Sequence, residues 1–380
     1  MPSTELRQTV LCNARRIVVK VGTGLLTSPD PDRPGLDLNY IRRIARQIAG
    51  LREQGYEVTL VASGAIGAGC LELGLKQRPR DVADLQAVAA VGQRKLMAHM
   101  HQAFARQKIH VAQMLVTRGD FDDRVRFLNI RNCVTRIHEH GCIPIINEND
   151  TVAVDELRFG DNDMLAALTA NAIRADALLL LTVVDGLLDE QGNRVDLIDN
   201  VTDMLSLARR DTSQWGTGGM LSKLEATRVV TEAGEIAVIA NGQEKNVLAR
   251  LLAGEALGSV FVPATRKLDS RQRWIALTAR PAGTITIDEG AVRAVTGRGK
   301  SLLATGIADI TGRFERGDVA LIRDPRGREV ARGLSNYSAD ELRLIRGKRS
   351  TQFANILGRS AYDEVIHRNN LVVLTPSDGR

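Results

Sequence analysis

The hydrophobic positions of the first 265 residues follow two alternating periods. Short β-branched or leucine-rich runs, typical of buried strands, are separated by longer segments with apolar residues at helical spacing. Strands are expected at 17–21, 56–62, 109–116, 143–146, 176–182, 236–240 and 258–262. Helices are expected at 38–54, 83–106, 127–140, 164–174, 217–232 and 246–252. This alternation predicts an α/β domain with an open, mostly parallel sheet sandwiched by helices.

The pattern changes after residue 265. No clear period covers residues 263–274, and beyond them short β-like runs are separated by glycines. Such spacing indicates a small β-rich domain, in the form of a barrel. We therefore expect a first domain over 1–265, a linker over 266–280, a second domain over 281–360 and a tail over 361–380.

The net charge of +6 is unevenly distributed between these parts. Residues 1–265 contain 30 basic and 32 acidic side chains (net −2), whereas residues 266–380 contain 21 basic and 13 acidic ones (net +8). The basic second domain is compatible with RNA contact, and a solvated arginine-rich face of a domain used for stability is the alternative. An exposed aromatic stacking set is not evident there, since only Phe314 and Tyr337 stand out.

Other features of the composition favour a cytoplasmic protein without membrane contact. No apolar run approaches the roughly 18 residues of a membrane-spanning helix, and the N-terminal segment has no apolar stretch typical of a signal peptide. The four cysteines form no CxxC pair and show no metal-ligand spacing. We interpret them as reduced, and we expect no protein-bound metal site.

A glycine-rich segment, GTGGMLSK at 216–223, raises the question of phosphate binding. It is not a Walker P-loop, because its lysine is not directly preceded by a glycine, and GRGKS at 297–301 fails because position 294 is alanine. Thr217, Gly218 and Gly219 are expected at the start of a helix, where free N–H groups and the helix dipole attract anions. Lys223 would reach back from the next turn. A capped helix with a surface lysine is the alternative.

Further polar residues follow other strands. Lys20 lies within the apolar run VVKV, and Gly22 and Thr23 follow in a turn that would face a phosphate. The alternative for Lys20 is an edge-strand lysine that points to solvent. Ser63 begins a glycine-containing turn into a helix, and a plain βα turn is the alternative there.

Two acidic and amide-rich segments complete the set. NEND at 147–150 follows a buried strand, and its Asn147 and Asp150 are suited to an ammonium or a hydroxyl group. GDND at 160–163 opens an apolar helix, and capping accounts for Asp161 or Asn162 but does not need both aspartates. An ionised aspartate at this helix start would orient lysines.

Ligands of such sheets bind at the carboxyl ends of the strands, where these segments are expected to meet. The six histidines lie off these loops, and no Ser-His-Asp set stands out. Glycine-rich anion turns, two lysines and aspartates therefore indicate phosphoryl transfer without a covalent intermediate, in which the protein positions the groups and stabilises charge.

At this point the motifs resemble a known family. VVKVGT, VASGAI, INENDTVAV, FGDNDMLAAL and GTGGMLSK, in this order, resemble the amino-acid kinase superfamily and within it the glutamate 5-kinase family. ITIDEGA, SLLATGI, GRFERGDV and VARGLSNY resemble a PUA domain, which is found in RNA-modifying proteins. Together the two resemblances cover essentially the whole chain.

The resemblance implies that ATP, with Mg²⁺, phosphorylates the γ-carboxylate of L-glutamate in the first step of proline biosynthesis. It further implies inhibition by proline, a homodimer or homotetramer, and RNA as a partner of the PUA domain. The implied catalytic residues are Lys20, Lys223 and Asp163. The implied ATP-binding residues are Lys20, Gly22, Thr23, Thr182, Val183, Thr217, Gly218, Gly219, Met220, Leu221, Ser222 and Lys223. The implied glutamate-binding residues are Ser63, Asn147, Asp150 and Asn162, with Asp150 at the ammonium group.

One position departs from the family pattern. Val183 stands where the family usually has an aspartate in the nucleotide pocket. Either backbone groups suffice, or Asp185 substitutes, or nucleotide affinity is lower. Two other interpretations stay open: a related kinase acting on acetylglutamate, aspartate, carbamate or UMP, and an RNA-binding protein with a vestigial kinase domain. An aspartate in the pocket argues for a free amino group, and Lys20, Asp163 and Lys223 argue for a working kinase.

Overall fold

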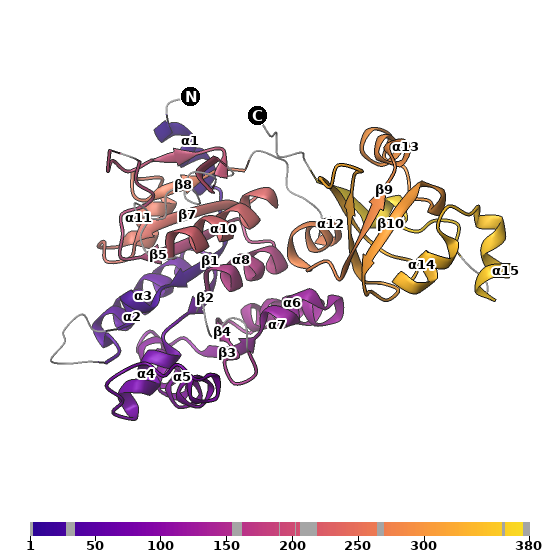
Figure 1. The fold of residues 1–380 in the computed structure, drawn as a ribbon. Helices are drawn as coiled ribbons and strands as arrows, with labels where there is room; N and C mark the ends of the chain where they lie inside the picture. The colour runs from indigo at the N-terminus through magenta and orange to yellow at the C-terminus, as the bar shows by residue number, and fades with distance from the viewer. Residues whose placement is uncertain are drawn as a thin grey trace. The chain divides into compact units, whose positions relative to one another are not determined.

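The computed structural model describes residues 3–27, 35–153, 162–189, 191–201, 203–205, 219–263, 270–358 and 362–374. The chain divides into two compact units, Met1–Lys267 and Leu268–Arg380. We describe each unit by itself (Figure 1). No helix within the described ranges combines the length and the apolar character needed to cross a membrane.

The first unit is built on an eight-stranded sheet, which confirms the predicted open and mostly parallel α/β architecture. Its strand order is β3-β4-β2-β1-β5-β7-β8-β6, and the β7–β8 pair is antiparallel. The strands are β1 (Arg16–Val21), β2 (Glu57–Ala62), β3 (Val111–Val116), β4 (Ile143–Glu148), β5 (Ala177–Thr182), β6 (Leu197–Ile198), β7 (Ile236–Asn241) and β8 (Ser259–Phe261). β4 runs two residues further than expected, so that Asn147 and Glu148 belong to the strand.

Helices cover both faces of this sheet (Figure 1). They are α1 (Ser3–Leu11), α2 (Thr23–Leu26), α3 (Leu38–Glu53), α4 (Ala65–Glu72), α5 (Val82–Ala105), α6 (Arg118–Asp122), α7 (Arg124–Glu139), α8 (Asn162–Ile173), α10 (Gly219–Glu232) and α11 (Val247–Leu252). Helices α1, α3, α5 and α11 share one core with Val19 and Val21 of β1. Lys20 points to the opposite face, because side chains alternate along a strand.

Helix α3 illustrates how the sequence sets an element. Asp37 caps its start by accepting hydrogen bonds from the backbone N–H groups of Asn39 (3.0 Å) and Tyr40 (2.9 Å). Ile41, Ile44 and Ile48, at helical spacing, are each at most 1% exposed, and each contributes about 1.5–3 kcal/mol by burial.

Helices α4 and α5 approach each other unusually closely. A Cβ atom on Gly69 would lie 1.9 Å from the carbonyl oxygen of Val88, and one on Gly92 would lie 1.8 Å from that of Ala65. Only glycine fits at these two crossing points. The close approach places the residue after Gly92 next to the carboxyl end of β4.

Helix α1 was not expected from the hydrophobic pattern. Arg7, only 1% exposed, anchors it to distant loops. Its guanidinium donates to the backbone carbonyls of Asp196 (2.9 Å), Glu255 (3.0 Å) and Gly258 (3.2 Å), and also to that of Leu257. These long-range contacts explain why local periodicity did not predict the helix.

The second unit contains a five-stranded sheet with the order β10-β9-β11-β12-β13. A core of its own includes Ile285, Ile322 and Tyr337. The strands are β9 (Gly283–Ile287), β10 (Ile307–Gly312), β11 (Val319–Arg323), β12 (Glu329–Leu334) and β13 (Leu371–Val373). The helical segments are α12 (Ser270–Arg273), η2 (Trp274–Thr278), α13 (Glu289–Val292), η3 (Arg293–Gly297), η4 (Ala304–Gly306), α14 (Ala339–Ile345), η5 (Ser350–Gln352), α15 (Phe353–Leu357) and η6 (Arg368–Asn370).

Two expectations for this part of the chain need correction. The expected linker 266–280 contains α12 and the π-helical turn η2, where Trp274 and Ile275 are at most 3% exposed. Arg332 of β12 donates to the carbonyl of Ala276 at 2.7 Å, which fastens η2 to the sheet. The expected tail 361–380 contributes β13, which pairs with β12. Leu371 of β13 belongs to the core of the second unit, and η2 packs against β12 and β13.

Candidate active site

Lys20 lies in the middle of the eight-stranded sheet. Its strand β1 pairs with β2 on one side and β5 on the other, with Lys20 opposite Val61 and Leu180. The residue is 6% exposed, and its Nζ atom lies 2.5 Å from Oδ1 of Asp163. The alternative of an edge-strand lysine in solvent is therefore wrong. The ammonium of Lys20 and the carboxylate of Asp163 therefore form a buried ion pair.

Asp163, in the first turn of α8, holds a second lysine with its other oxygen. Nζ of Lys223, on α10, lies 3.0 Å from Asp163 Oδ2, and the Ser222 hydroxyl donates to the same oxygen at 3.1 Å. Burial would raise the pKa of Asp163, but the charges of Lys20 and Lys223 outweigh it and hold that pKa below its usual value. Two ammonium groups share one carboxylate, so the cluster keeps one excess positive charge, which suits an anion.

The turn after β1 leaves room beside this cluster. Gly22 donates its N–H to the carbonyl of Leu181 at 3.2 Å and precedes α2, which begins at Thr23. A Cβ atom on Gly22 would lie 3.8 Å from Nζ of Lys20, so a side chain here would occupy space next to the ammonium. Thr23 is the first residue of the short helix α2 and does not belong to an irregular turn.

Of the GTGGMLSK segment, Thr217 and Gly218 lie outside the described residues. Within the described part, α10 begins at Gly219 and continues through Met220 and Leu221. Its next two residues, Ser222 and Lys223, are those that contact Asp163. The segment therefore contributes to the lysine cluster directly.

A second, neutral polar network lies at the carboxyl ends of β2 and β4. Nδ2 of Asn162 lies 2.9 Å from the carbonyl of Ala62, 3.0 Å from Oγ of Ser63 and 2.8 Å from Oδ1 of Asn147. Ser63, Asn147 and Asn162 are each at most 8% exposed. The structure thus brings together three of the four residues expected to bind glutamate.

Gln93 of α5 belongs to this network and was missed in the sequence. Its Oε1 accepts a hydrogen bond from Nδ2 of Asn147 at 2.7 Å, across 54 positions of the chain. Gln93 is only 9% exposed. The one sequence feature that marks it is a polar residue directly after Gly92 on the buried side of a helix.

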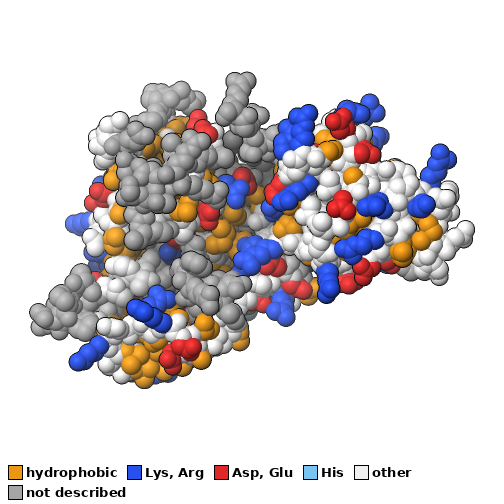
Figure 2. Space-filling model, viewed as in Figure 1, with side chains coloured by type: hydrophobic (Ala, Val, Ile, Leu, Met, Phe, Trp, Pro, Cys, Tyr) orange, Lys and Arg blue, Asp and Glu red, His pale blue; other side chains and the backbone are white. Residues whose placement is uncertain are grey.

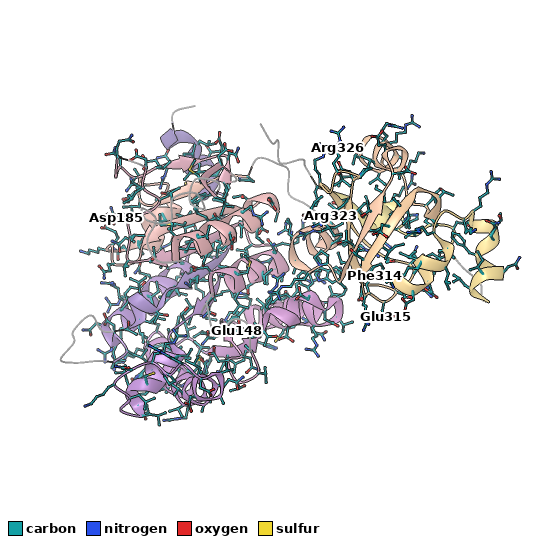
Figure 3. The ribbon with its side chains drawn as sticks, in the orientation of Figure 1. Glu148, Asp185, Phe314, Glu315, Arg323 and Arg326 are labelled. Carbon is teal, nitrogen blue, oxygen red and sulfur yellow. The ribbon has the colours of Figure 1, made fainter. Side chains whose placement is uncertain are left out.

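One cavity of about 350 Å³ is lined by Asp150 together with Ser63, Asn147 and Asn162 of the network. Burial raises the pKa of Asp150 to about 6, and the charge of Arg78 acts against this rise. Glu148, which is labelled in Figure 3 and ends β4, lines the same cavity. The start of α4, where Gly64 has φ = 99°, and the loop after this helix also line the cavity. The full lining is Thr23, Ser63, Gly64, Ala65, Ile66, Gly67, Cys70, Leu75, Lys76, Gln77, Arg78, Asn147, Glu148, Asp150 and Asn162.

The end of β5 borders the turn after β1. A Cβ atom on Gly24 would lie 3.4 Å from Cγ1 of Val183, whose residue is 50% exposed. Thr182 accepts a backbone hydrogen bond from Gly242 at 2.8 Å. The carboxylate of Asp185, labelled in Figure 3, accepts a side-chain hydrogen bond from Nδ2 of Asn241 at 2.9 Å.

Two consecutive residues join the halves of the site. Asn162 belongs to the neutral network that lines the cavity, and Asp163 holds the two lysines. The first turn of α8 therefore places a pocket of amino-acid size next to a cationic cluster. This arrangement is suited to the transfer of an anionic group onto a small acceptor.

Comparisons with known proteins agree with this geometry. The model of the Amino acid kinase family matches residues 15–241, and that of the PUA domain matches residues 283–357. A glutamate 5-kinase of Synechococcus sp. (strain JA-3-3Ab) is 46% identical over 365 residues, covering 94% of this chain and 98% of that protein. A glutamate 5-kinase of Citrifermentans bemidjiense is 43% identical over 376 residues, covering 97% of this chain and all of the relative. The chain therefore belongs to the glutamate 5-kinases, which are enzymes of the amino acid kinase family, and it carries a PUA domain.

Proposed function

We propose that the protein transfers the γ-phosphoryl group of MgATP to the γ-carboxylate of L-glutamate, giving L-glutamyl 5-phosphate and ADP, in proline biosynthesis. The observation that carries the proposal is the ion-pair cluster of Lys20, Asp163 and Lys223 beside the cavity that Asp150 lines. The names of the full-length relatives support the choice of substrate.

In this mechanism a γ-carboxylate oxygen attacks the γ-phosphorus, and the bond to the bridging oxygen of ADP breaks. Lys20 and Lys223 offset the negative charge of the transferred group, and Asp163 positions both ammonium groups. Gly22 leaves space for the phosphates. The attacking carboxylate is already ionised at neutral pH, so the reaction needs no general base. No histidine is among the described residues that line the cavity.

Asp150 is proposed to hold the α-ammonium group of glutamate, with Ser63, Asn147 and Asn162 next to it. This assignment disfavours acetylglutamate, whose acylated nitrogen carries no charge. Gln93 would keep Asn147 in orientation through their 2.7 Å hydrogen bond.

For the nucleotide we propose that Asp185 takes the place of the aspartate that the family usually has at position 183. Asn241 holds one oxygen of Asp185 at the carboxyl end of the sheet. The other oxygen would accept a ribose hydroxyl hydrogen bond, while Val183 offers an exposed apolar surface.

The test is product trapping. The enzyme is incubated with MgATP and hydroxylamine and with glutamate, acetylglutamate or aspartate, and acyl phosphate is read as hydroxamate. Hydroxamate from glutamate alone is expected. Product from another acid would change the substrate, and no product from any acid would refute the kinase activity. Lys223→Ala should lower turnover by about 10²–10³, and little loss would contradict the role of this lysine.

We further propose that proline inhibits the enzyme by competing in the cavity, because it shares the α-ammonium and α-carboxylate groups of glutamate. Proline should then raise the KM for glutamate without lowering the maximal rate. A lowered maximal rate at saturating glutamate would place proline elsewhere.

A separate proposal is that the PUA unit contacts RNA. A cavity of about 730 Å³ in this unit is lined in part by Lys300, His367 and Arg368. Lys and Arg side chains, interspersed with acidic ones, also spread over its visible face (Figure 2). Phe314 and Tyr337 are buried, so base stacking on them is excluded. Binding to a structured RNA should fall steeply between 50 and 200 mM salt, by roughly tenfold or more, and salt-independent binding would contradict a phosphate contact.

A further inference from the structure

The proposed function leaves one charge of glutamate without a partner, and the inference below rests on that function. Glutamate carries an α-ammonium group and two carboxylates. Asp150 is assigned to the ammonium, and the lysine cluster faces the γ-carboxylate. Ser63, Asn147 and Asn162 are neutral. Since a bound carboxylate requires a compensating charge when it leaves water, a cation is expected at the α-carboxylate.

The position of this cation is restricted by the substrate. The ammonium and the α-carboxylate of an amino acid are attached to the same carbon, so their partners must be neighbours. The cation must therefore lie next to Asp150.

Two cations occur among the described residues that line this cavity, Lys76 and Arg78. Both are exposed and lie in the loop between α4 and α5. Arg78 is close enough to Asp150 for its charge to act against the rise of that carboxyl's pKa. Asp150 and Arg78 thus provide one negative and one positive side chain, which match the α-ammonium and the α-carboxylate groups of glutamate.

We propose that Arg78 binds the α-carboxylate of glutamate and thereby selects amino acids with a free α-carboxylate, with Lys76 adding positive charge at the same end. The guanidinium group presents two parallel N–H donors, which match a carboxylate better than the single ammonium of a lysine does. Arg78 is thus a specificity residue for the acceptor, remote from the transferred phosphoryl group.

The experiment pairs a change in the enzyme with a change in the substrate. Wild type, Arg78→Gln and Arg80→Gln are assayed with glutamate and with its 1-amide, which replaces the α-carboxylate by a neutral amide of similar shape. Arg80 is an exposed arginine two positions away that does not line the cavity, and it serves as the matched control.

Wild type and Arg80→Gln should prefer glutamate to the 1-amide by about 10- to 100-fold in kcat/KM, the effect of one charged hydrogen-bonded pair. Arg78→Gln should lose most of this preference through a higher KM for glutamate, with kcat and the KM for ATP nearly unchanged. Arg78→Lys should fall between them. An Arg78→Gln enzyme that keeps the wild-type preference would overturn the proposal.

Calorimetric binding of both compounds without ATP separates this proposal from the proposed function. If wild type binds glutamate but produces no hydroxamate, the proposed function fails while the role of Arg78 is still tested by binding. If Arg78→Gln binds glutamate as tightly as wild type does, Arg78 does not recognise the α-carboxylate. If wild type binds neither compound, both proposals fail.

Discussion

The ion-pair cluster gives the sharpest prediction, for Asp163→Asn. The substitution keeps the shape of the side chain and removes its charge. Asp163 is 3% exposed, and the side chains of Lys20 and Lys223 are 7% and 13% exposed. The variant would therefore leave two nearly buried ammonium groups facing each other without a counter-charge.

The expected magnitude follows from this burial. Removing one partner of a buried ion pair costs about 3–5 kcal/mol, and we expect about 3 kcal/mol because the side chains of the two lysines retain some solvent exposure. For a unit of this size each kcal/mol lowers Tm by roughly 2–4 °C, so Tm should fall by roughly 6–12 °C. Turnover should fall by about 10²–10³, since both lysines lose their orientation.

The pH dependence provides a second readout. The pKa of Asp163 is lower in the folded than in the unfolded protein. Its stabilisation is therefore complete above the ordinary aspartate pKa and is lost as pH falls through the lower folded value. Asp163→Asn should lack this part of the acid dependence of Tm.

Thermal unfolding and the hydroxamate assay measure the two effects separately. Asp324→Asn is the control: Asp324 is 2% exposed in the second unit and accepts hydrogen bonds from the backbone of Arg326 and Arg328. It should lose stability without losing turnover. If Asp163→Asn retains turnover within about threefold of wild type, well below the expected loss, the positioning role is refuted.

Three further predictions concern other parts of the site. Because the pKa of Asp150 is raised to about 6, the KM for glutamate should rise as pH falls below about 6, where the protonated acid cannot hold an ammonium group. Asp150→Asn should abolish this dependence, and a flat wild-type profile would contradict the assignment. Gly92→Ala should lower stability by about 3 kcal/mol or more, as its Cβ would lie 1.8 Å from the Ala65 carbonyl oxygen. Gly297→Ala, with nothing within 4 Å, should be nearly neutral, and equal melting temperatures of the two variants would rule out the clash. Asp185→Asn should raise the KM for ATP about tenfold while leaving that for glutamate unchanged; equal KM values for ATP would favour recognition by backbone groups.

The sequence predicted the parallel sheet because each long strand and helix carries its own period. It did not predict the position of β1 in the middle of the sheet, because strand order is set by long-range pairing. The burial of Lys20 follows from that order. Trp274 was assigned to a linker because a π-helical turn has no recognisable period, and its packing depends on β12.

The residues of the candidate site also divide into those that a local sequence pattern predicted and those that long-range contacts bring to the site. Lys20, Asp163 and Lys223 were marked by local chemistry: a lysine in an apolar strand, and polar residues at helix starts. Gln93 and Arg78 were not identified: Gln93 reaches the site through the contact of α4 with α5, and Arg78 lies in the loop between these two helices. That contact depends on two glycines 23 positions apart, Gly69 and Gly92, which no local pattern relates.

The adjacency of Asn162 and Asp163 has a consequence for inhibitor chemistry. Their Cα atoms are separated by one trans peptide, about 3.8 Å, so the backbone positions that carry the acceptor half and the phosphoryl half of the site keep a fixed spacing. A single molecule that joins an amino-acid head to a phosphonate through a short rigid linker could therefore engage both halves at once. The best length of its linker would follow from the short distance between these two neighbouring residues. Lengthening the linker by a single methylene group should reduce the potency of the inhibitor sharply.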